Sequence, residues 1–117
     1  MKKFTILIPI FNDWESLEKL LNDINSNIKN IKKAEFNCVV INDCSTIIKK
    51  NIKIPQQLNS IRIIHMNKNK GHARCNAFGI KYMSKKKDLD YLILMDGDGE
   101  DRPEEIKLLV EKVLNDP

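Results

Sequence analysis

Short apolar segments alternate along the chain with segments of helical periodicity, and this alternation limits the fold more than any other feature. Runs rich in β-branched residues predict four strands, at residues 4–10, 36–43, 60–66 and 90–96. Apolar residues at helical spacing predict three helices, at residues 12–28, 71–86 and 102–116. Because the strands are nearly all apolar and helices separate most of them, we expect an α/β fold with a doubly wound, mainly parallel, Rossmann-like sheet.

The helical segments also predict which side chains face the core. In residues 12–28 the inward positions are Trp14, Leu17, Leu20, Leu21, Ile24 and Ile28, with Asn12 or Asp13 as the N-cap. In residues 71–86 the expected inward positions are Ala73, Ala77, Ile80 and either Tyr82 or Met83. Pro103 suits the first turn of the third helix.

Composition excludes several classes of protein. The 117 residues are 42% hydrophobic and 31% charged, which is typical of at most one globular domain. The net charge of +4 comes mostly from lysines that are scattered rather than interleaved with aromatic residues, so no nucleic-acid partner is expected. Three cysteines, an odd number without a C-x-x-C pair, argue against a disulfide framework or a zinc site and fit the cytoplasm.

The chain lacks the features of a secreted or membrane-spanning segment. Pro9 and Asn12 interrupt the apolar run near the N-terminus, and no apolar run approaches the ~20 residues that span a bilayer. Any membrane association is therefore expected from the surface or from a missing C-terminal region. The last residues supply no element that closes the domain, which predicts that the chain is truncated at its C-terminus.

Polar residues follow three of the predicted strands. They are Pro9–Asp13 after the first strand, Asn42–Asp43 after the second and Asp96–Glu100 after the fourth. Ligands of open parallel sheets bind beyond the carboxyl ends of the strands. The three segments therefore predict a single site at one edge of the sheet.

Asp96 and Asp98 are the strongest candidates for metal chemistry. Two residues apart on an extended chain, they point to the same face about 6–7 Å from each other. Carboxylates that close repel unless a cation or donor lies between them, and oxygen ligands suit Mg²⁺ or Mn²⁺. Gly97 and Gly99 would let a phosphate approach the backbone closely.

The alternative interpretation of the acidic segment is a Gly-Asp turn that caps the following helix. This interpretation is favoured for Asp101 as an N-cap, and for Glu104 and Glu105, which would interact with the helix dipole. It explains one acid but not the pair of Asp96 and Asp98.

The other strand ends each have two interpretations. Asp43 can accept a hydrogen bond from a uracil imino group or a ribose hydroxyl, or it can form a strand-end turn with Ser45 and Thr46. The segment IPIFND (8–13) can present backbone groups to a base, or can simply lead into a capped helix.

Gly71 begins the predicted helix 71–86 among basic residues, namely Lys68, Lys70, His72 and Arg74. This helix start can meet a diphosphate, or it can be an ordinary helix entry with solvated lysines. Neither His65 nor His72 has an evident partner in the sequence, so neither is expected to be catalytic.

Four stretches together resemble the family-two inverting glycosyltransferases with the GT-A fold. IPIFND is similar to the family's P-x-Y/F-N-E/D element, and VVINDCST to its V-D-D-G-S-T strand end. NKNKGHARCNAFGI is similar to its N-x-G-x-x-x-A-x-x-x-G helix entry. LILMDGDGEDRPEEI resembles its D-x-D motif and proline-glutamate helix, most closely in the dolichyl- and undecaprenyl-phosphate sugar synthases. Each motif is weak alone, but their order and spacing over nearly the whole chain are specific.

The resemblance implies that residues 1–117 are the donor-binding part of an enzyme that transfers a sugar from a UDP- or GDP-sugar with Mg²⁺ or Mn²⁺. Asp96, Asp98 and Glu100 would hold the metal. The donor would contact Pro9, Ile10, Asn12, Asn42, Asp43, Gly71, Asp96 and Gly97. The acceptor would be a lipid phosphate or a glycan, as in cell-envelope glycan synthesis at the inner face of the membrane. The catalytic base is expected beyond Pro117, so these residues alone are expected to be inactive.

The chain departs from the family pattern at several positions. Asn42 stands where the family has the first acid of its D-D pair, and Cys44 stands in place of its glycine, which implies altered base recognition. Asn76, rather than Arg74, falls where many members carry the arginine of an A-R-N element.

Three alternatives remain at this point. A nucleotidyltransferase would need a Gly- and Arg-rich loop after the first strand, and IPIFND supplies none. A receiver-type signalling module would need an acidic pair at the end of that strand, where the chain has Pro9 and Ile10. A non-catalytic nucleotide-binding domain would keep the fold without the chemistry.

Overall fold

A computed structural model of the protein describes residues 1–47, 51–86, 88–96 and 102–115. The strands are β1 (Lys2–Ile10), β2 (Ala34–Asn42), β3 (Ser60–His65) and β4 (Tyr91–Leu94). The helices are α1 (Trp14–Ile28), α2 (His72–Ser84) and α3 (Pro103–Asn115). Every predicted element is present, with bounds that differ by no more than a few residues.

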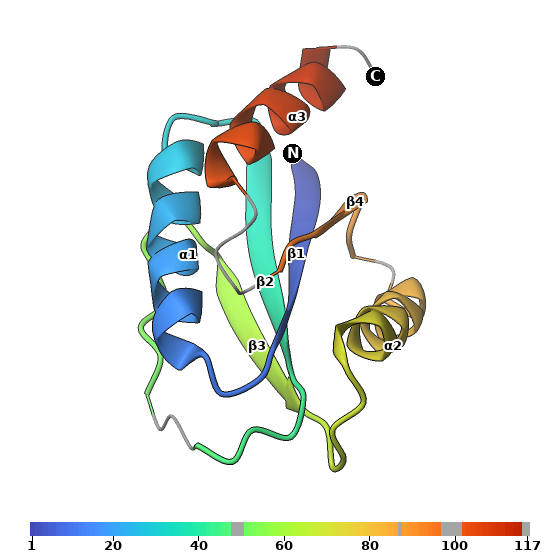
Figure 1. The fold of residues 1–117 in the computed structure, drawn as a ribbon. Coiled ribbons are helices and arrows are strands. Elements are labelled where there is room, and N and C mark those ends of the chain that lie inside the picture. Colours follow the sequence, from blue (N-terminus) through green and yellow to red (C-terminus); the bar gives the residue numbers. More distant parts are fainter. Residues whose placement is uncertain (48–50, 87, 97–101, 116–117) are drawn as a thin grey trace.

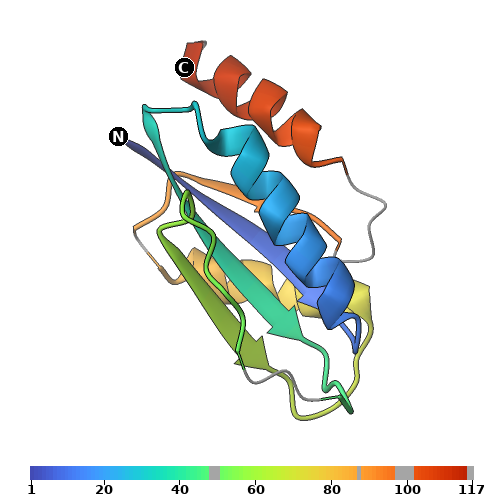
Figure 2. The same ribbon diagram turned by 90° about the vertical axis from the view of Figure 1, so that its left-hand side faces the viewer.

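The four strands form one parallel sheet in the order β3-β2-β1-β4. Helices α1 and α3 cover one face of the sheet and α2 covers the other, as Figures 1 and 2 show. The prediction of a doubly wound parallel sheet is therefore confirmed. The connection from β2 to β3 contains no helix in its described residues and packs Ile52 and Leu58 into the cluster on the α1 face.

The central strand β1 supplies side chains to both layers of the core. Ile6, Ile8 and Ile10 lie in the hydrophobic cluster with α1 and α3, whereas Leu7 lies in the cluster with α2. This division follows from the alternation of side chains along a strand. The six predicted inward residues of α1 are all buried, and the carboxylate of Asp13 accepts a hydrogen bond from the backbone N–H of Ser16 at 3.2 Å as the N-cap.

The prediction for the inward face of α2 was largely wrong. The buried residues of α2 are Cys75, Gly79 and Met83, so Met83 alone was placed correctly. Ala73 and Ala77 are exposed, and 44% of the surface of Ile80 is accessible. The reason is close packing: an added Cβ at Gly79 would lie 2.6 Å from both δ-carbons of Leu7, so the helix presents its glycine to the sheet there.

Replacing Gly79 with alanine should therefore lower the free energy of unfolding by about 1–3 kcal/mol. Alanine gains about 1 kcal/mol in helix propensity, but Leu7 is fully buried and its methyl groups have little room to move aside. Urea denaturation measures the change. Adding Leu7→Val to Gly79→Ala should recover part of the loss, and a Gly79→Ala protein as stable as the wild type would contradict this packing.

Candidate functional site

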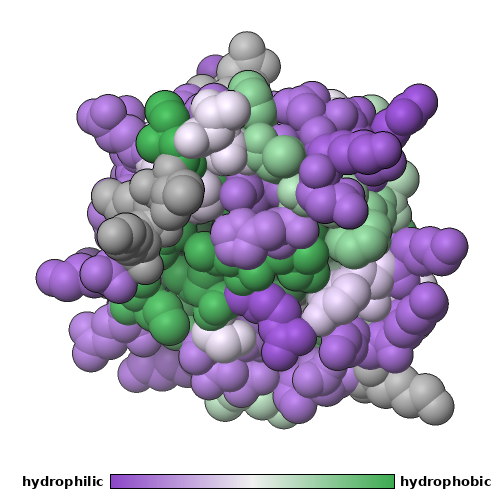
Figure 3. Space-filling view, turned by 90° about the horizontal axis from the view of Figure 1, so that it is seen from below, coloured by the Kyte–Doolittle hydropathy of each residue, from purple (hydrophilic) through white to green (hydrophobic). Residues whose placement is uncertain are grey.

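The carboxyl ends of β2, β1 and β4 are neighbours at one edge of the sheet. Figure 3 looks onto this edge from below the view of Figure 1 and shows hydrophobic surface bordered by hydrophilic side chains. Phe11 and Ile47, in the loops that follow β1 and β2, are exposed by 40% and 58%. The predicted convergence of these strand ends is therefore present in the fold.

Asn42 is the last residue of β2 and Asp43 follows it; both are buried, with exposed fractions of 7% and 1%. Successive residues of a strand point to opposite faces, so the two side chains reach different loops. Asp43 contacts the segment that leads into α2, and Asn42 contacts the loop beyond β2 and the end of β3. This adjacent pair thus joins segments on both sides of the sheet.

The carboxylate of Asp43 binds the start of α2. Its Oδ1 accepts the backbone N–H of Lys70 at 2.7 Å, and its Oδ2 accepts that of Gly71 at 2.8 Å. The backbone carbonyl of Asp43 accepts the side-chain amide of Asn69 at 3.3 Å. Both carboxylate oxygens therefore hold the loop, and the predicted contact of Asp43 with a base or ribose stays a prediction.

These hydrogen bonds also affect acidity. Burial alone would raise the pKa of Asp43, but the N–H groups of Lys70 and Gly71, the thiol of Cys75 and the charge of His72 together lower it. The pKa of Cys75 rises to about 11, because of its burial and its hydrogen bond to Asp43. Asp43 is therefore held as a carboxylate, while Cys75 is held as a thiol.

Asn12 connects the loop after β1 to the loop after β2. Its Oδ1 accepts the backbone N–H groups of Thr46 at 2.8 Å and Ile47 at 2.9 Å, and its own N–H donates to Ser45 Oγ at 2.8 Å. The indole N–H of Trp14 adds a hydrogen bond to the carbonyl of Ile47 at 2.8 Å. The side chain of Asn12, which was predicted to contact the donor, therefore holds the loop after β1 against the loop after β2.

The other predicted donor-binding residues lie at the same edge in different surroundings. Pro9 is buried within β1, and Ile10 is a core residue whose carbonyl accepts the N–H of Asp43 at 2.8 Å. Gly71 has φ of +85° and no atom within 4 Å of where a Cβ would lie, so open space adjoins the start of α2. Any other residue at position 71 would be strained at that φ.

Asp96 follows β4 and is half-buried. Gly97, Asp98, Glu100 and Asp101 lie outside the described residues. Among the residues that the structure describes, no cluster of three or more His, Cys, Asp or Glu side chains could hold a metal ion. Glu104 and Glu105 stand in the first turn of α3, as the helix-start interpretation predicted.

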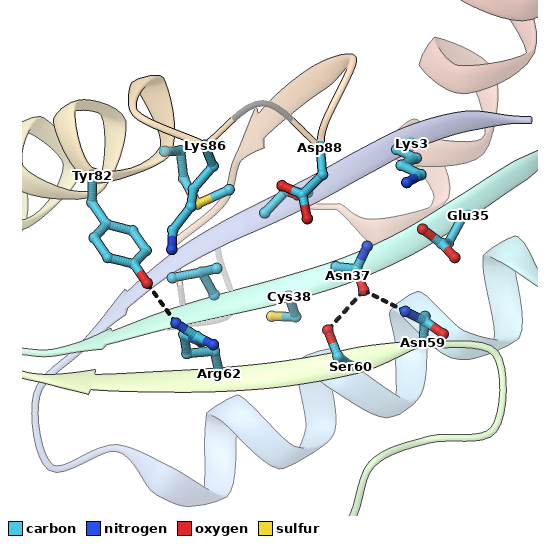
Figure 4. A pocket seen from close by; sticks show the side chains of 13 residues that line it. Lys3, Glu35, Asn37, Cys38, Asn59, Ser60, Arg62, Tyr82, Lys86 and Asp88 are labelled. Carbon is cyan, nitrogen blue, oxygen red and sulfur yellow. Dashed lines mark hydrogen bonds between the residues drawn. The ribbon is translucent and has the colours of Figure 1, made fainter.

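A separate hollow of about 380 Å³ lies on the α2 face of the sheet, near the starts of the strands (Figure 4). Asn37 Oδ1 accepts hydrogen bonds from Asn59 Nδ2 and Ser60 Oγ at its floor. At its rim, Arg62 donates to the hydroxyl of Tyr82 at 2.7 Å. This hollow is at the opposite end of the strands from the predicted site and contains none of the predicted site residues.

Sequence reasoning missed a partner for His65. The parallel register places His65 beside Asn42, and their side-chain nitrogens Nδ1 and Nδ2 are 2.9 Å apart. On α2, Oδ1 of Asn76 is buried without a hydrogen-bond partner in the part of the chain that the structure describes. No local pattern could have revealed either feature, because both depend on the pairing of distant segments.

The edge just described combines a parallel sheet, acidic strand ends and a glycine at a helix start. The family model for glycosyl transferase family 2 matches residues 5–117. The chain belongs to this family. The resemblance inferred from the four motifs is thus confirmed at the level of the family.

Curated relatives agree with this assignment. Proteins from Salmonella choleraesuis and Salmonella paratyphi B, each named undecaprenyl-phosphate 4-deoxy-4-formamido-L-arabinose transferase, are both 30% identical to the chain over 115 residues. The alignments cover 96% of this chain but 34% of each relative. The chain therefore spans about a third of the length of these relatives.

Solved structures confirm the fold. Crystal structures of TarS from S. aureus match with TM-scores of 0.69 for residues 1–349 alone and 0.70 for the same fragment in complex with UDP-GlcNAc. Both share 22% sequence identity and cover 98% of this chain, and about a third of the TarS chain is matched. No helix among the described residues is both long and apolar enough to cross a membrane.

Proposed function

We propose that the full-length protein in which these residues occur transfers a sugar from a nucleotide-sugar donor, and that residues 1–117 supply the donor side of its active site. The observation that carries this proposal is the convergence of the β1, β2 and β4 ends at one edge in a chain of this family. The same edge of an open parallel sheet is where such folds bind nucleotides. A UDP- or GDP-sugar is the proposed donor.

The loops at this edge are suited to receive a nucleoside diphosphate. The hydrogen bonds of Asn12, Asn42 and Asp43 fix the loop after β1, the described start of the loop after β2 and the segment before α2 in one arrangement, so little ordering of these segments would accompany binding. The side chains of Lys68 and Lys70 precede α2, and open space adjoins Gly71. These features support binding of the diphosphate near the start of α2, with the nucleoside directed toward the loops after β1 and β2.

Asp96, Asp98 and Glu100 are the proposed ligands of Mg²⁺ or Mn²⁺. Asp96 is the member of this set that the structure describes, and its chemistry suits a divalent ion. It is a half-buried carboxylate just after β4, the strand next to the central strand β1. Carboxylate oxygens are the ligands that these ions prefer. A bound divalent ion would stabilise the negative charge of the departing nucleoside diphosphate.

The proposed acceptor is a polyprenyl phosphate at the inner face of the membrane. Support comes from the relatives that are named as undecaprenyl-phosphate transferases. The base that activates the acceptor, or the groups that position its phosphate, would lie beyond Pro117. The 117 residues alone are accordingly proposed to bind the donor without transferring the sugar.

Calorimetric titration of UDP, GDP and their sugar derivatives, with and without Mn²⁺, tests the donor site. We expect one nucleoside diphosphate to bind at least about tenfold more tightly with Mn²⁺, because the ion neutralises charge shared by phosphate and carboxylates. Incubation of the full-length protein with the preferred nucleotide sugar and undecaprenyl phosphate then tests transfer. Binding without transfer would favour a non-catalytic nucleotide-binding domain, and no binding of any nucleoside diphosphate would refute the proposal.

A further inference from the structure

Asn42 and His65 form a pair at the carboxyl ends of β2 and β3. They are directly opposite each other in the parallel register, and Asn42 Nδ2 lies 2.9 Å from His65 Nδ1. Asn42 is buried, whereas His65 is exposed. The distance alone leaves open which nitrogen donates, because the hydrogen positions of amides and imidazoles must be inferred from their partners.

Ser45 determines the orientation of the Asn42 amide. The backbone N–H of Ser45 can only donate, and it lies 3.1 Å from Asn42 Oδ1. The Ser45 hydroxyl also hydrogen-bonds to Oδ1, and it accepts the N–H of Asn12, so its own hydrogen is available to Oδ1. The amide oxygen therefore faces Ser45, and the NH₂ group faces His65.

The NH₂ group carries only donors, so His65 Nδ1 must accept. The neutral ring then carries its proton on Nε2. A ring with its proton on Nδ1 would place an N–H against the NH₂ group, and the amide could relieve this contact only by giving up its bonds to Ser45. The contacts of the Ser45 loop and the tautomer of His65 are thus coupled through a single amide.

We propose that His65 is a positioning residue of the donor site, which acts through Asn42 as the neutral Nε2–H tautomer. The inference rests on the proposed function for its relevance to nucleotide binding. His65 holds Asn42, Asn42 holds Ser45, and Ser45 with Asn12 holds the loop that includes Thr46 and Ile47. Three strand ends are connected in this way, although the ring of His65 belongs to none of the family-like motifs.

The tautomer can be measured without any ligand. In ¹⁵N-histidine-labelled protein at about pH 8, where an ordinary imidazole is neutral, long-range ¹H–¹⁵N correlations should show the His65 proton on Nε2. The His65 signal is assigned by its loss in His65→Asn. In Asn42→Asp the carboxylate offers only acceptors, so the proton should move to Nδ1. A wild-type ring with its proton on Nδ1, or a tautomer that Asn42→Asp leaves unchanged, would overturn the proposal.

The functional consequence is tested by a matched pair of variants in the full-length protein. His65→Leu removes the acceptor and should raise the KM for the nucleotide sugar about tenfold with kcat unchanged, as expected for one lost hydrogen bond that orders a loop. His65→Asn offers an amide oxygen near the position of Nδ1 and should restore most of the affinity. The amide signals of Ser45, Thr46 and Ile47 should shift in His65→Leu and return in His65→Asn.

The two measurements separate the two proposals. A wild-type KM in His65→Leu, or an equal loss in His65→Asn, would contradict the positioning role even if the enzyme is a transferase. If no nucleotide sugar is used at all, the proposed function fails, while the tautomer and the loop signals still decide whether His65 acts through Asn42.

Discussion

In the full-length protein, replacing Asp98 with asparagine should lower the turnover of the proposed sugar transfer by about 10²–10³-fold, the largest effect expected from any single change in these residues. Asp98 is the second acid of the D-G-D sequence after β4, and we propose it as a ligand of the divalent ion. An amide keeps the size of the side chain but removes its negative charge. Turnover of the preferred nucleotide sugar, measured across a range of Mn²⁺ concentrations, should fall without recovering at high metal.

Glu104→Gln is the matched control for this experiment. It removes a carboxylate from the same acidic segment, but Glu104 stands in the first turn of α3, where it interacts with the helix dipole. Its turnover should remain near the wild-type value. Equal losses in Asp98→Asn and Glu104→Gln would show that the segment acts only through its total charge. An Asp98→Asn enzyme with normal turnover would remove the metal from the proposal.

Replacing Asp43 with asparagine should lower the free energy of unfolding by about 2–4 kcal/mol at neutral pH. The carboxylate accepts backbone N–H groups from Lys70 and Gly71, and it is 1% exposed. Asparagine at position 43 has one acceptor oxygen, which can serve only one of these two backbone N–H groups. Its NH₂ group would face the other N–H, and because both groups are donors, neither has a partner there. Urea denaturation of the two proteins measures the difference.

The pH dependence of this difference has a definite sign. The pKa of Asp43 is lower in the folded protein than its usual value of 3.8. The stabilisation is therefore complete above that usual value and is lost as the pH falls through the lower, folded pKa. The gap between wild type and Asp43→Asn should stay constant between about pH 5 and 8 and narrow below about pH 4.

Asp13→Asn provides the control for the Asp43 result. Asp13 also accepts a backbone N–H at a helix start, but it is exposed and asparagine is an equally good N-cap. Its stability should change by only a few tenths of a kcal/mol. If Asp43→Asn is no more destabilising than Asp13→Asn, the carboxylate does not hold the loop before α2.

Sequence reasoning succeeded where a feature depends on local periodicity. The inward residues of α1 follow from helical spacing in a strongly amphipathic segment, and all six were correct. The apolar pattern of α2 is weaker, and the inward face predicted from it was mostly wrong. Cys75 and Gly79, which pack against the sheet, were not among the predicted inward residues. Gly79 packs closely against Leu7, and only the position of Leu7 in the sheet reveals that contact.

Alternating apolar strands and amphipathic helices were sufficient to predict a parallel sheet with polar residues of three strands at one edge, because backbone pairing and burial follow from residue pattern. Which atoms Asn42 and Asp43 hold could emerge only in the folded chain. Their partners Lys70, Gly71 and His65 are brought to them by the register of β2 with β3 and by the position of α2. Residues 43–59 connect β2 to β3. The described part of this connection has no helix and no periodic pattern from which the register could be predicted.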